Sequence, residues 1–343
     1  MLDEFRQSLR ELTPLPGISG HEDPASAYMA RHLGELADEV SIDLLGNVIA
    51  RFGAKEKPAA AVMAHIDTVG FLVKRVNPDG SLGVVLVGGV NLKALPGTPV
   101  RVGDLPGVIG IRSQHQAQPN EAAVSADDLY IHVGTGQSVE ITTPITYATS
   151  AVELAGNFWS SPYLDNRAGC AVLLALARLL KDKKAQTVYL IGTVQEETTC
   201  QGAYHALDVI RPDAALFVDG TVSYDTPDTR GRGSVSLGAG PVLTSFLYTS
   251  GLNGWHAHPS LRSQLKRIAE EVGFPYQQDA VHGLMSDARA VTPLGIPSAL
   301  VGLPMRGKHS PMEMISLDDL VIATRLLYAF LERPLPSLQR GTS

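Results

Sequence analysis

The sequence predicts an α/β protein whose main domain is interrupted by an all-β block. Residues 1–69 and the chain from residue 165 onward alternate short apolar runs with helical patterns, as α/β domains do. Residues 70 to about 157 contain only short alternating runs and turn signals. The mostly apolar run 187–194 reads as a buried strand, and Glu196-Glu197 follow it, at the edge where open α/β sheets bind ligands.

The first 69 residues predict two helices, a hairpin and a strand. Helical spacing of apolar residues predicts a first helix over about the first dozen residues. Pro24 opens a second helix through about Leu36, since proline is favoured in a first turn. Residues 40–52 alternate around Gly46-Asn47 as a hairpin does. The apolar strand 59–64 then leads to His65.

The following block predicts a small β-barrel or sandwich, because its short strands are closely spaced and separated by turns such as 77–80. We therefore expect a discontinuous α/β domain, 1–69 and 158–343, with residues 70–157 inserted. The predicted strands of the block are 71–73, 82–87, 98–102, 108–111, 129–133 and 139–141.

The α/β pattern resumes at Asp165. The almost wholly apolar stretch 167–181 predicts a buried helix. A strand over 214–218 ends at Asp219, and another over 298–303 precedes His309. Further helices are expected near 200–209, over 261–272, and from a capping Ser316 to about Leu331.

Composition restricts the function. The 343 residues carry a net charge of −7 without a basic block, which argues against a nucleic-acid or anionic-membrane surface. The N-terminal residues lack a signal-peptide pattern, and no apolar run approaches the roughly 18 residues that span a bilayer. Only Cys170 and Cys200 are present, so a cytoplasmic location is expected and a four-cysteine zinc site is excluded.

Potential metal ligands follow the predicted strands. Ends of neighbouring parallel strands lie about 4.8 Å apart, so distant residues can converge there. Two histidines and three carboxylates suit two divalent ions that share one carboxylate, and the spare glutamate could move a proton. Taken singly, such a histidine is usually a loop residue and such an aspartate a helix cap. The candidate ligands are His65, Asp165, Glu197, Asp219 and His309.

Five motifs together resemble the tetrahedral aminopeptidases, the glutamyl and leucyl aminopeptidase family M42 of di-metal exopeptidases. The match follows the family's order over nearly the whole chain. Gly88-Gly89 and residues 129–134 in the inserted block also resemble that family. The motifs are Ala64-His65-Ile66-Asp67-Thr68-Val69-Gly70, Leu164-Asp165-Asn166-Arg167-Ala168-Gly169, Val194-Gln195-Glu196-Glu197, Val218-Asp219 and His309-Ser310-Pro311-Met312-Glu313.

The resemblance implies a zinc-exopeptidase-like α/β domain, with a mixed central sheet flanked by helices and an inserted β-barrel used for dimerisation. It also implies peptide substrates shortened from their free N-termini, two divalent metal ions, zinc or cobalt, and self-association as dimers and dodecamers. His65 and Asp219 would hold one ion, Glu197 and His309 the other, with Asp165 bridging; Glu196 would be the general base, and Asp67 would orient His65.

The sequence departs from the family pattern at Thr68, at Asn166, over 198–202 and over 284–287. These positions are expected to border the pocket and to influence substrate preference and metal occupancy.

Two alternatives remain open: a carboxypeptidase or amide deacylase of the wider clan, and a catalytically silent oligomeric binding protein. Of the other reactive residues, Cys200 is interpreted as a packed helix-start residue, and His256 and His258 as a lead-in to a helix. Arg306 and Lys308 either contact substrate or are solvated.

Overall fold

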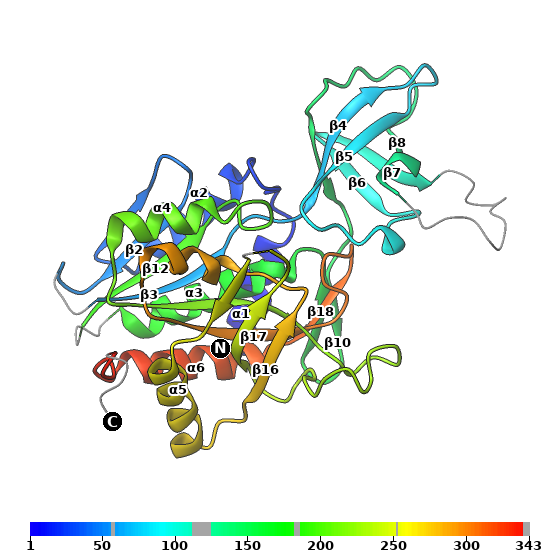
Figure 1. Cartoon of the computed structure of the whole chain (residues 1–343). Helices are drawn as coiled ribbons and strands as arrows, with labels where there is room; N and C mark the ends of the chain where they lie inside the picture. Colours follow the sequence, from blue (N-terminus) through cyan, green and yellow to red (C-terminus); the bar gives the residue numbers. More distant parts are fainter. Residues whose placement is uncertain (56–58, 112–124, 182–185, 252, 339–343) are drawn as a thin grey trace.

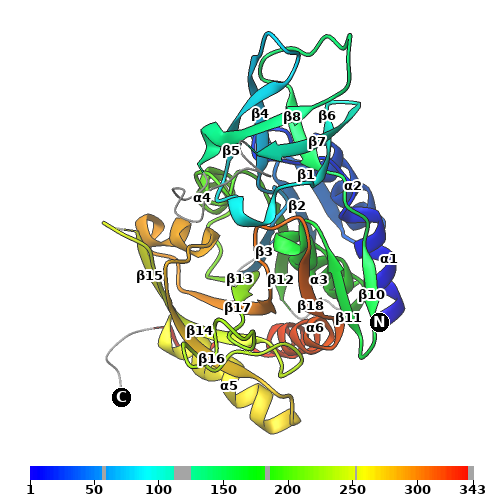
Figure 2. The same cartoon turned by 90° about the vertical axis from the view of Figure 1, so that its right-hand side faces the viewer.

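A mixed α/β domain carries a projecting β-barrel (Figures 1 and 2) in the computed structural model, which describes residues 1–55, 59–111, 125–181, 186–251 and 253–338. The central sheet of these residues has nine strands in the order β1-β2-β12-β3-β13-β17-β14-β15, with β16 beside β14. The middle strands β12, β3, β13 and β17 are parallel, while β2 and β14 flank them antiparallel. The bounds are β1 (Glu39–Ile42), β2 (Val48–Phe52), β3 (Ala59–His65), β12 (Thr187–Thr193), β13 (Ala214–Val222), β14 (Val242–Tyr248), β15 (Gly254–His256), β16 (Gln277–His282) and β17 (Ser298–Met305).

Helices cover both faces of the central sheet. Alternate residues of β3 contribute to different apolar clusters. Val62 belongs to the cluster that includes residues of α1, α2, α3, α5 and α6, whereas Met63 belongs to the cluster that includes residues of α4 and the 3-10 segment η3. Nearly every residue of α3 is buried, as its apolar sequence predicts. None of the helices in the described ranges is long and apolar enough to cross a membrane. The bounds are α1 (Leu2–Leu12), α2 (Asp23–Gly34), α3 (Leu164–Leu180), α4 (Gln201–Ile210), α5 (Pro259–Val272), α6 (Leu317–Leu331) and η3 (Asp287–Leu294).

The inserted block forms a closed barrel with the strand order β4-β5-β8-β7-β6-β9. Alternating apolar residues such as Phe71, Ile109 and Ile145 fill its interior. Its strands lie inside the expected insertion 70–157. Two 3-10 segments and a separate three-stranded sheet, β10-β11-β18, complete the structure. The bounds are β4 (Gly70–Val76), β5 (Leu82–Val87), η1 (Leu92–Ala94), β6 (Pro99–Val102), β7 (Leu105–Ile111), η2 (Ala126–Asp128), β8 (Leu129–His132), β9 (Pro144–Tyr147), β10 (Val152–Leu154), β11 (Phe158–Ser161) and β18 (Glu313–Ser316).

Three local predictions were wrong. Residues 139–141 form no strand: Ile141 is 60% exposed, and the chain turns at Thr142, where φ is 73°, before β9 begins. Strand β13 does not end at Val218, because its next four residues keep their pairing with β17, so Asp219 lies within the strand. Ser316 occupies the N-cap position of α6, but its side chain makes no capping hydrogen bond.

Candidate metal centre

The parallel strands bring the candidate ligands to one edge of the sheet. His65 is the last residue of β3 and lies in register with Thr193, the last residue of β12. The turn after β12 carries Glu196 and Glu197, while Asp219 belongs to β13. His309 follows β17 in a loop and has a positive φ of 63°. Segments far apart in sequence thus supply one cluster, as the strand-end argument predicts.

Two triads of potential ligands share Asp165. His65, Asp165 and Asp219 form one, and Asp165, Glu197 and His309 form the other; within each triad the ligand atoms lie within 4.8 Å of one another. His65 Nε2 is 3.5 Å from Asp165 Oδ1 and 3.6 Å from Asp219 Oδ1. His309 Nε2 is 3.1 Å from Asp165 Oδ2 and 3.3 Å from Glu197 Oε2. Each oxygen of Asp165 therefore faces a different histidine.

The carboxylate oxygens of this cluster leave room for cations. Both oxygens of Asp165, Oε1 of Glu197 and Oδ1 of Asp219 are buried without a hydrogen bond from any described residue, although Asp165 Oδ2 has ion-pair contacts. Buried acceptors without hydrogen bonds are costly, and carboxylates this close repel one another. Imidazole and carboxylate ligands suit zinc, cobalt or manganese. The residues present therefore fit a pair of divalent ions.

Both histidines are fixed through their Nδ1 atoms. His65 Nδ1 is 3.0 Å from the backbone oxygen of Asp67, and His309 Nδ1 is 2.8 Å from that of Gly89, which belongs to the inserted block. A carbonyl oxygen accepts only, so each Nδ1 carries a proton, and Nε2 is the ring nitrogen that faces the carboxylates. Space beside Gly89 is limited, because a Cβ there would lie 3.1 Å from His309 Nδ1.

The Asp67 carboxylate mainly holds the turn with the two glutamates. It accepts the backbone N–H groups of Glu196, at 2.9 Å, and Glu197, at 3.0 Å, and the hydroxyl of Ser19. Its Oδ1 is 3.5 Å from His65 Nδ1, farther than the Asp67 backbone oxygen. Asp67 therefore joins the end of β3 to the turn after β12.

Glu196 lies beside the triads with its Oε2 3.7 Å from His65 Nε2. It also forms a third group with His65 and Glu197, whose ligand atoms meet the same 4.8 Å limit as those of the two triads. Burial raises the pKa of Glu196 well above its ordinary value, and the charge of His65 offsets this only in part. The Glu196 carboxylate thus lies beside the proposed ligands but belongs to neither of the two triads that contain Asp165.

Glu313 is the last residue of the motif that begins at His309, and the sequence predicts no role for it. It is fully enclosed and accepts the backbone N–H of Asp165, at 2.8 Å, and that of His309, at 2.6 Å. Burial raises the pKa of Glu313 to about 8. One side chain thus fixes the backbone of two ligands that are distant in sequence. Only its place four residues after His309 could have indicated this.

A cavity of about 430 Å³ opens onto the cluster. The departures from the family pattern within 198–202 and 284–287 line this cavity. The departures at Thr68 and Asn166 do not, contrary to expectation. The Thr68 hydroxyl donates to the Gly17 backbone oxygen, and Asn166 Nδ2 donates to that of Val218. The cavity is lined by Gly89, Glu196, Glu197, Thr198, Cys200, Val222, Gly283, Leu284, Met285, Arg289, Lys308 and His309.

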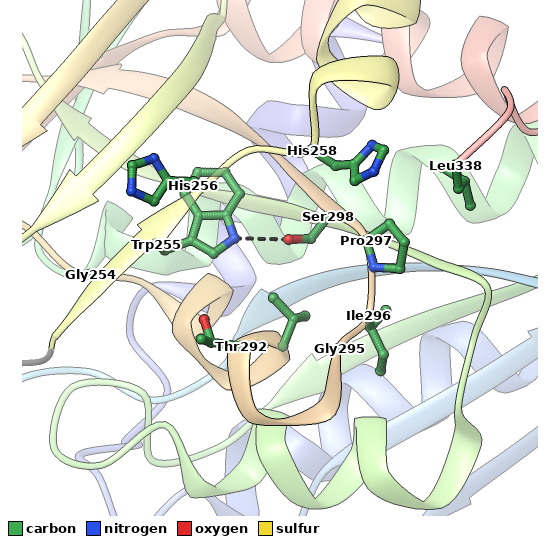
Figure 3. A pocket seen from close by; sticks show the side chains of 11 residues that line it. Gly254, Trp255, His256, His258, Thr292, Gly295, Ile296, Pro297, Ser298 and Leu338 are labelled. Atoms are coloured by element: carbon green, nitrogen blue, oxygen red, sulfur yellow. Dashed lines mark hydrogen bonds between the residues drawn. The ribbon is translucent and has the colours of Figure 1, made fainter. Parts of the chain in front are cut away.

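Cys200 and the histidine pair agree with their structural interpretations. Cys200 is the buried N-cap residue of α4, and burial raises the pKa of its thiol, which disfavours the nucleophilic thiolate. His256 ends β15 and His258 is the N-cap of α5. In Figure 3 their rings lie apart, on either side of Trp255, in a separate cavity of about 420 Å³.

Arg306 and Lys308 differ in their surroundings. Arg306 donates two hydrogen bonds to Asp225, at 2.9 and 2.7 Å, and does not line the cavity. Lys308 lines it, with Nζ 2.8 Å from Asp165 Oδ2. Burial lowers the pKa of Lys308, but Asp165 and the other carboxylates outweigh this and raise it above its ordinary value. The sequence offered no signal for this contact.

The pair formed by Asp225 and Arg306 gives a prediction for stability. The Arg306 hydrogen bonds lower the pKa of Asp225 from 3.8 to about 2. The stabilisation is therefore present above pH 3.8 and is lost as the pH falls toward about 2. Because the pair is partly exposed, Asp225→Asn should lower the free energy of unfolding by only about 1 kcal/mol at pH 7.

Urea denaturation at pH 7 and at stepwise lower pH measures this loss. Arg306→Met should cost a similar amount, and the double variant should cost less than the sum of the two. Additive effects, or a loss that does not shrink as the pH falls below 4, would contradict the assigned pairing.

Comparison with known proteins places the chain among aminopeptidases. The model of the family described as M42 glutamyl aminopeptidase matches residues 46–326. SgcX of Escherichia coli (strain K12) is 34% identical, over 94% of this chain and 92% of that protein.

Two solved structures extend the likeness to the fold. Aminopeptidase APDkam598 from the archaeon Desulfurococcus kamchatkensis has a TM-score of 0.92 and 28% identity, covering 99% of each chain. The TET1 peptidase of Pyrococcus horikoshii, described as assembling into a tetrahedron or a large octahedral shell, has a TM-score of 0.83 and 26% identity, covering 95% of this chain and 98% of that one.

Proposed function

The chain belongs to the M42 glutamyl aminopeptidase family and is a peptidase. On this premise, we propose that it is a di-metal aminopeptidase that removes N-terminal residues from peptides. The observation that carries the proposal is the meeting of two ligand triads at Asp165, with Glu196 beside them. His65, Asp219 and Asp165 Oδ1 would hold one ion, and Glu197, His309 and Asp165 Oδ2 the other. We propose zinc or cobalt, which this donor set accepts.

When bound, the ions supply Lewis acidity and a water of lowered pKa. The chain supplies the proton transfers. Glu196 takes a proton from the attacking water on its carboxylate and delivers it to the nitrogen of the leaving amine. Its raised pKa suits the holding of that proton between the two transfers. Asp67 positions this glutamate by accepting its backbone N–H, and its backbone oxygen orients the ring of His65.

We further propose that the chain self-associates, through a dimer formed by residues 70–157, into a dodecamer. The exposed apolar residues Val76, Val85 and Val108 on the barrel strands support a contact there. The assembly described for the TET1 peptidase of P. horikoshii supports the larger particle. A cytoplasmic location is proposed because both cysteines are buried and free. Light scattering on the purified protein tests the assembly.

A peptide panel tests the substrate class. The metal-loaded protein should release the first residue of peptides with free N-termini and leave their N-acetylated counterparts intact. Mass spectrometry of the products identifies which end is shortened. Preference for blocked N-termini would favour an amide deacylase, loss of C-terminal residues a carboxypeptidase, and the absence of any turnover a binding protein.

A further inference from the structure

Lys308 places a positive charge inside the cluster of ligands. It lies in the loop after β17, next to His309, and its side chain is only 14% exposed. Nζ is 2.8 Å from Asp165 Oδ2 and donates a hydrogen bond to the backbone oxygen of Gly220, at 3.1 Å. Gly220 follows Asp219 in β13, so the ammonium group lies between the shared carboxylate and the backbone beside another ligand. These contacts hold it away from solvent.

The charge is on one side of the shared carboxylate only. Oδ2 of Asp165 faces both Lys308 and His309, whereas Oδ1 faces His65. Among the residues that the structure describes, Lys308 is the only lysine or arginine in ion-pair contact with a proposed ligand. The ammonium group therefore contacts the oxygen of the shared carboxylate that faces His309, and no described lysine or arginine contacts the oxygen that faces His65.

On the basis of the proposed function, we propose that Lys308 is a built-in competitor of the second divalent ion, the one held by Asp165 Oδ2, Glu197 and His309. Like charges repel, and burial limits the screening of that repulsion by water and salt. Lys308 also neutralises part of the charge on the oxygen that this ion needs. The ion of the His65 triad consequently binds first and tightly, and the second binds more weakly and exchanges.

Lys308 also explains how the cluster remains intact with one ion. Without a second ion, the negative charges of Asp165 and Glu197 would lie close together, and His309 would be the only group of their triad able to offset the repulsion. The ammonium group supplies the missing positive charge in place. The enzyme at low metal concentration would thus hold one ion with Lys308 beside it, and the second ion would bind as its concentration rises.

Calorimetric titration of the chelator-treated, full-length protein with zinc tests the proposal without reference to activity. Wild type should give a tight step and a second step weaker on the order of 10–100-fold, the range seen when groups around metal ligands are altered. Lys308→Met removes the charge and keeps a long side chain. It should tighten the second step about tenfold or more and leave the first nearly unchanged.

Three further variants assign the steps. Arg289→Met removes a positive charge that lines the same cavity without an ion-pair contact to a proposed ligand among the described residues, and it should change neither step. Lys308→Arg keeps the charge and should keep the two steps unequal. His309→Ala should abolish only the weak step, with elemental analysis after gel filtration confirming one retained ion.

The possible outcomes distinguish failure of the proposed competition by Lys308 from failure of the proposed di-metal function. Two equal steps in wild type, or an unchanged ratio of affinities in Lys308→Met, would overturn the competition by Lys308 while leaving the di-metal site in place. Binding of no ion at all by folded wild type would overturn the proposed function itself. The wild-type titration decides the first point even where a variant does not fold.

Discussion

Glu196→Gln should lower turnover by about 10²–10⁴-fold, the range attributed to general acid–base catalysis, with metal content near that of wild type. Glutamine has a similar shape but cannot take a proton from water at neutral pH. Glu196 is not shared by the two triads around Asp165, so its replacement should leave the proposed ions in place. Steady-state kinetics on a free-amino peptide, together with elemental analysis of the same sample, measure both quantities.

The neighbouring glutamate provides the matched control. Glu197 is in the triad with His309, with Oε2 at 3.3 Å from His309 Nε2. Glu197→Gln should therefore lower the affinity for the second ion, whereas Glu196→Gln should not. Undiminished turnover in Glu196→Gln would reject this residue as the base. Loss of metal in that variant would instead make it a ligand.

Asp165→Asn should have the broadest effect on the metal centre, because Asp165 is the one residue that belongs to both triads. Its two oxygens lie 3.5 Å from His65 Nε2 and 3.1 Å from His309 Nε2. An amide offers one neutral oxygen in place of the bridging charge, so both ions should bind more weakly. Bound metal ions stabilise a transition state by several kcal/mol, so their weaker binding predicts a loss of turnover of about 10²-fold or more.

Asp219→Asn is the control for that prediction, because it alters the His65 triad alone. It should weaken one ion and leave the other near its wild-type affinity. Thermal melting of both chelated variants separates loss of metal from loss of fold. Normal uptake of two ions by Asp165→Asn would contradict the bridging role.

The convergence of the ligands could be predicted because parallel strands end side by side. The apolar run before Glu196 and the buried helix after Asp165 each position a carboxylate by a rule that depends on local sequence. The roles of those ligands remain proposals. The spacing of the short strands in residues 70–157 predicts either a β-barrel or a β-sandwich, and only the family resemblance favours the barrel.

Other features of the site depend on loop geometry, which periodicity does not encode. Lys308 contacts Asp165 from the loop after β17, in which its neighbours Gly307 and His309 both have a positive φ. Glu313 supports two backbones through contacts between distant segments. Thr68 was expected at the pocket, yet it is buried against Gly17, since strand-end position alone does not fix where a side chain points.

The contact between the inserted block and His309 limits how far the two parts of the chain can be treated as modules. The Gly89 carbonyl accepts from the His309 ring, and the Asn91 N–H donates to the His309 carbonyl, at 3.1 Å. A shortened chain from which the barrel is excised would lose one hydrogen bond to the His309 ring, whose Nε2 faces Asp165 and Glu197, and one to the His309 backbone. Swapping barrels between relatives would succeed only where the graft brings this glycine-bearing loop with it.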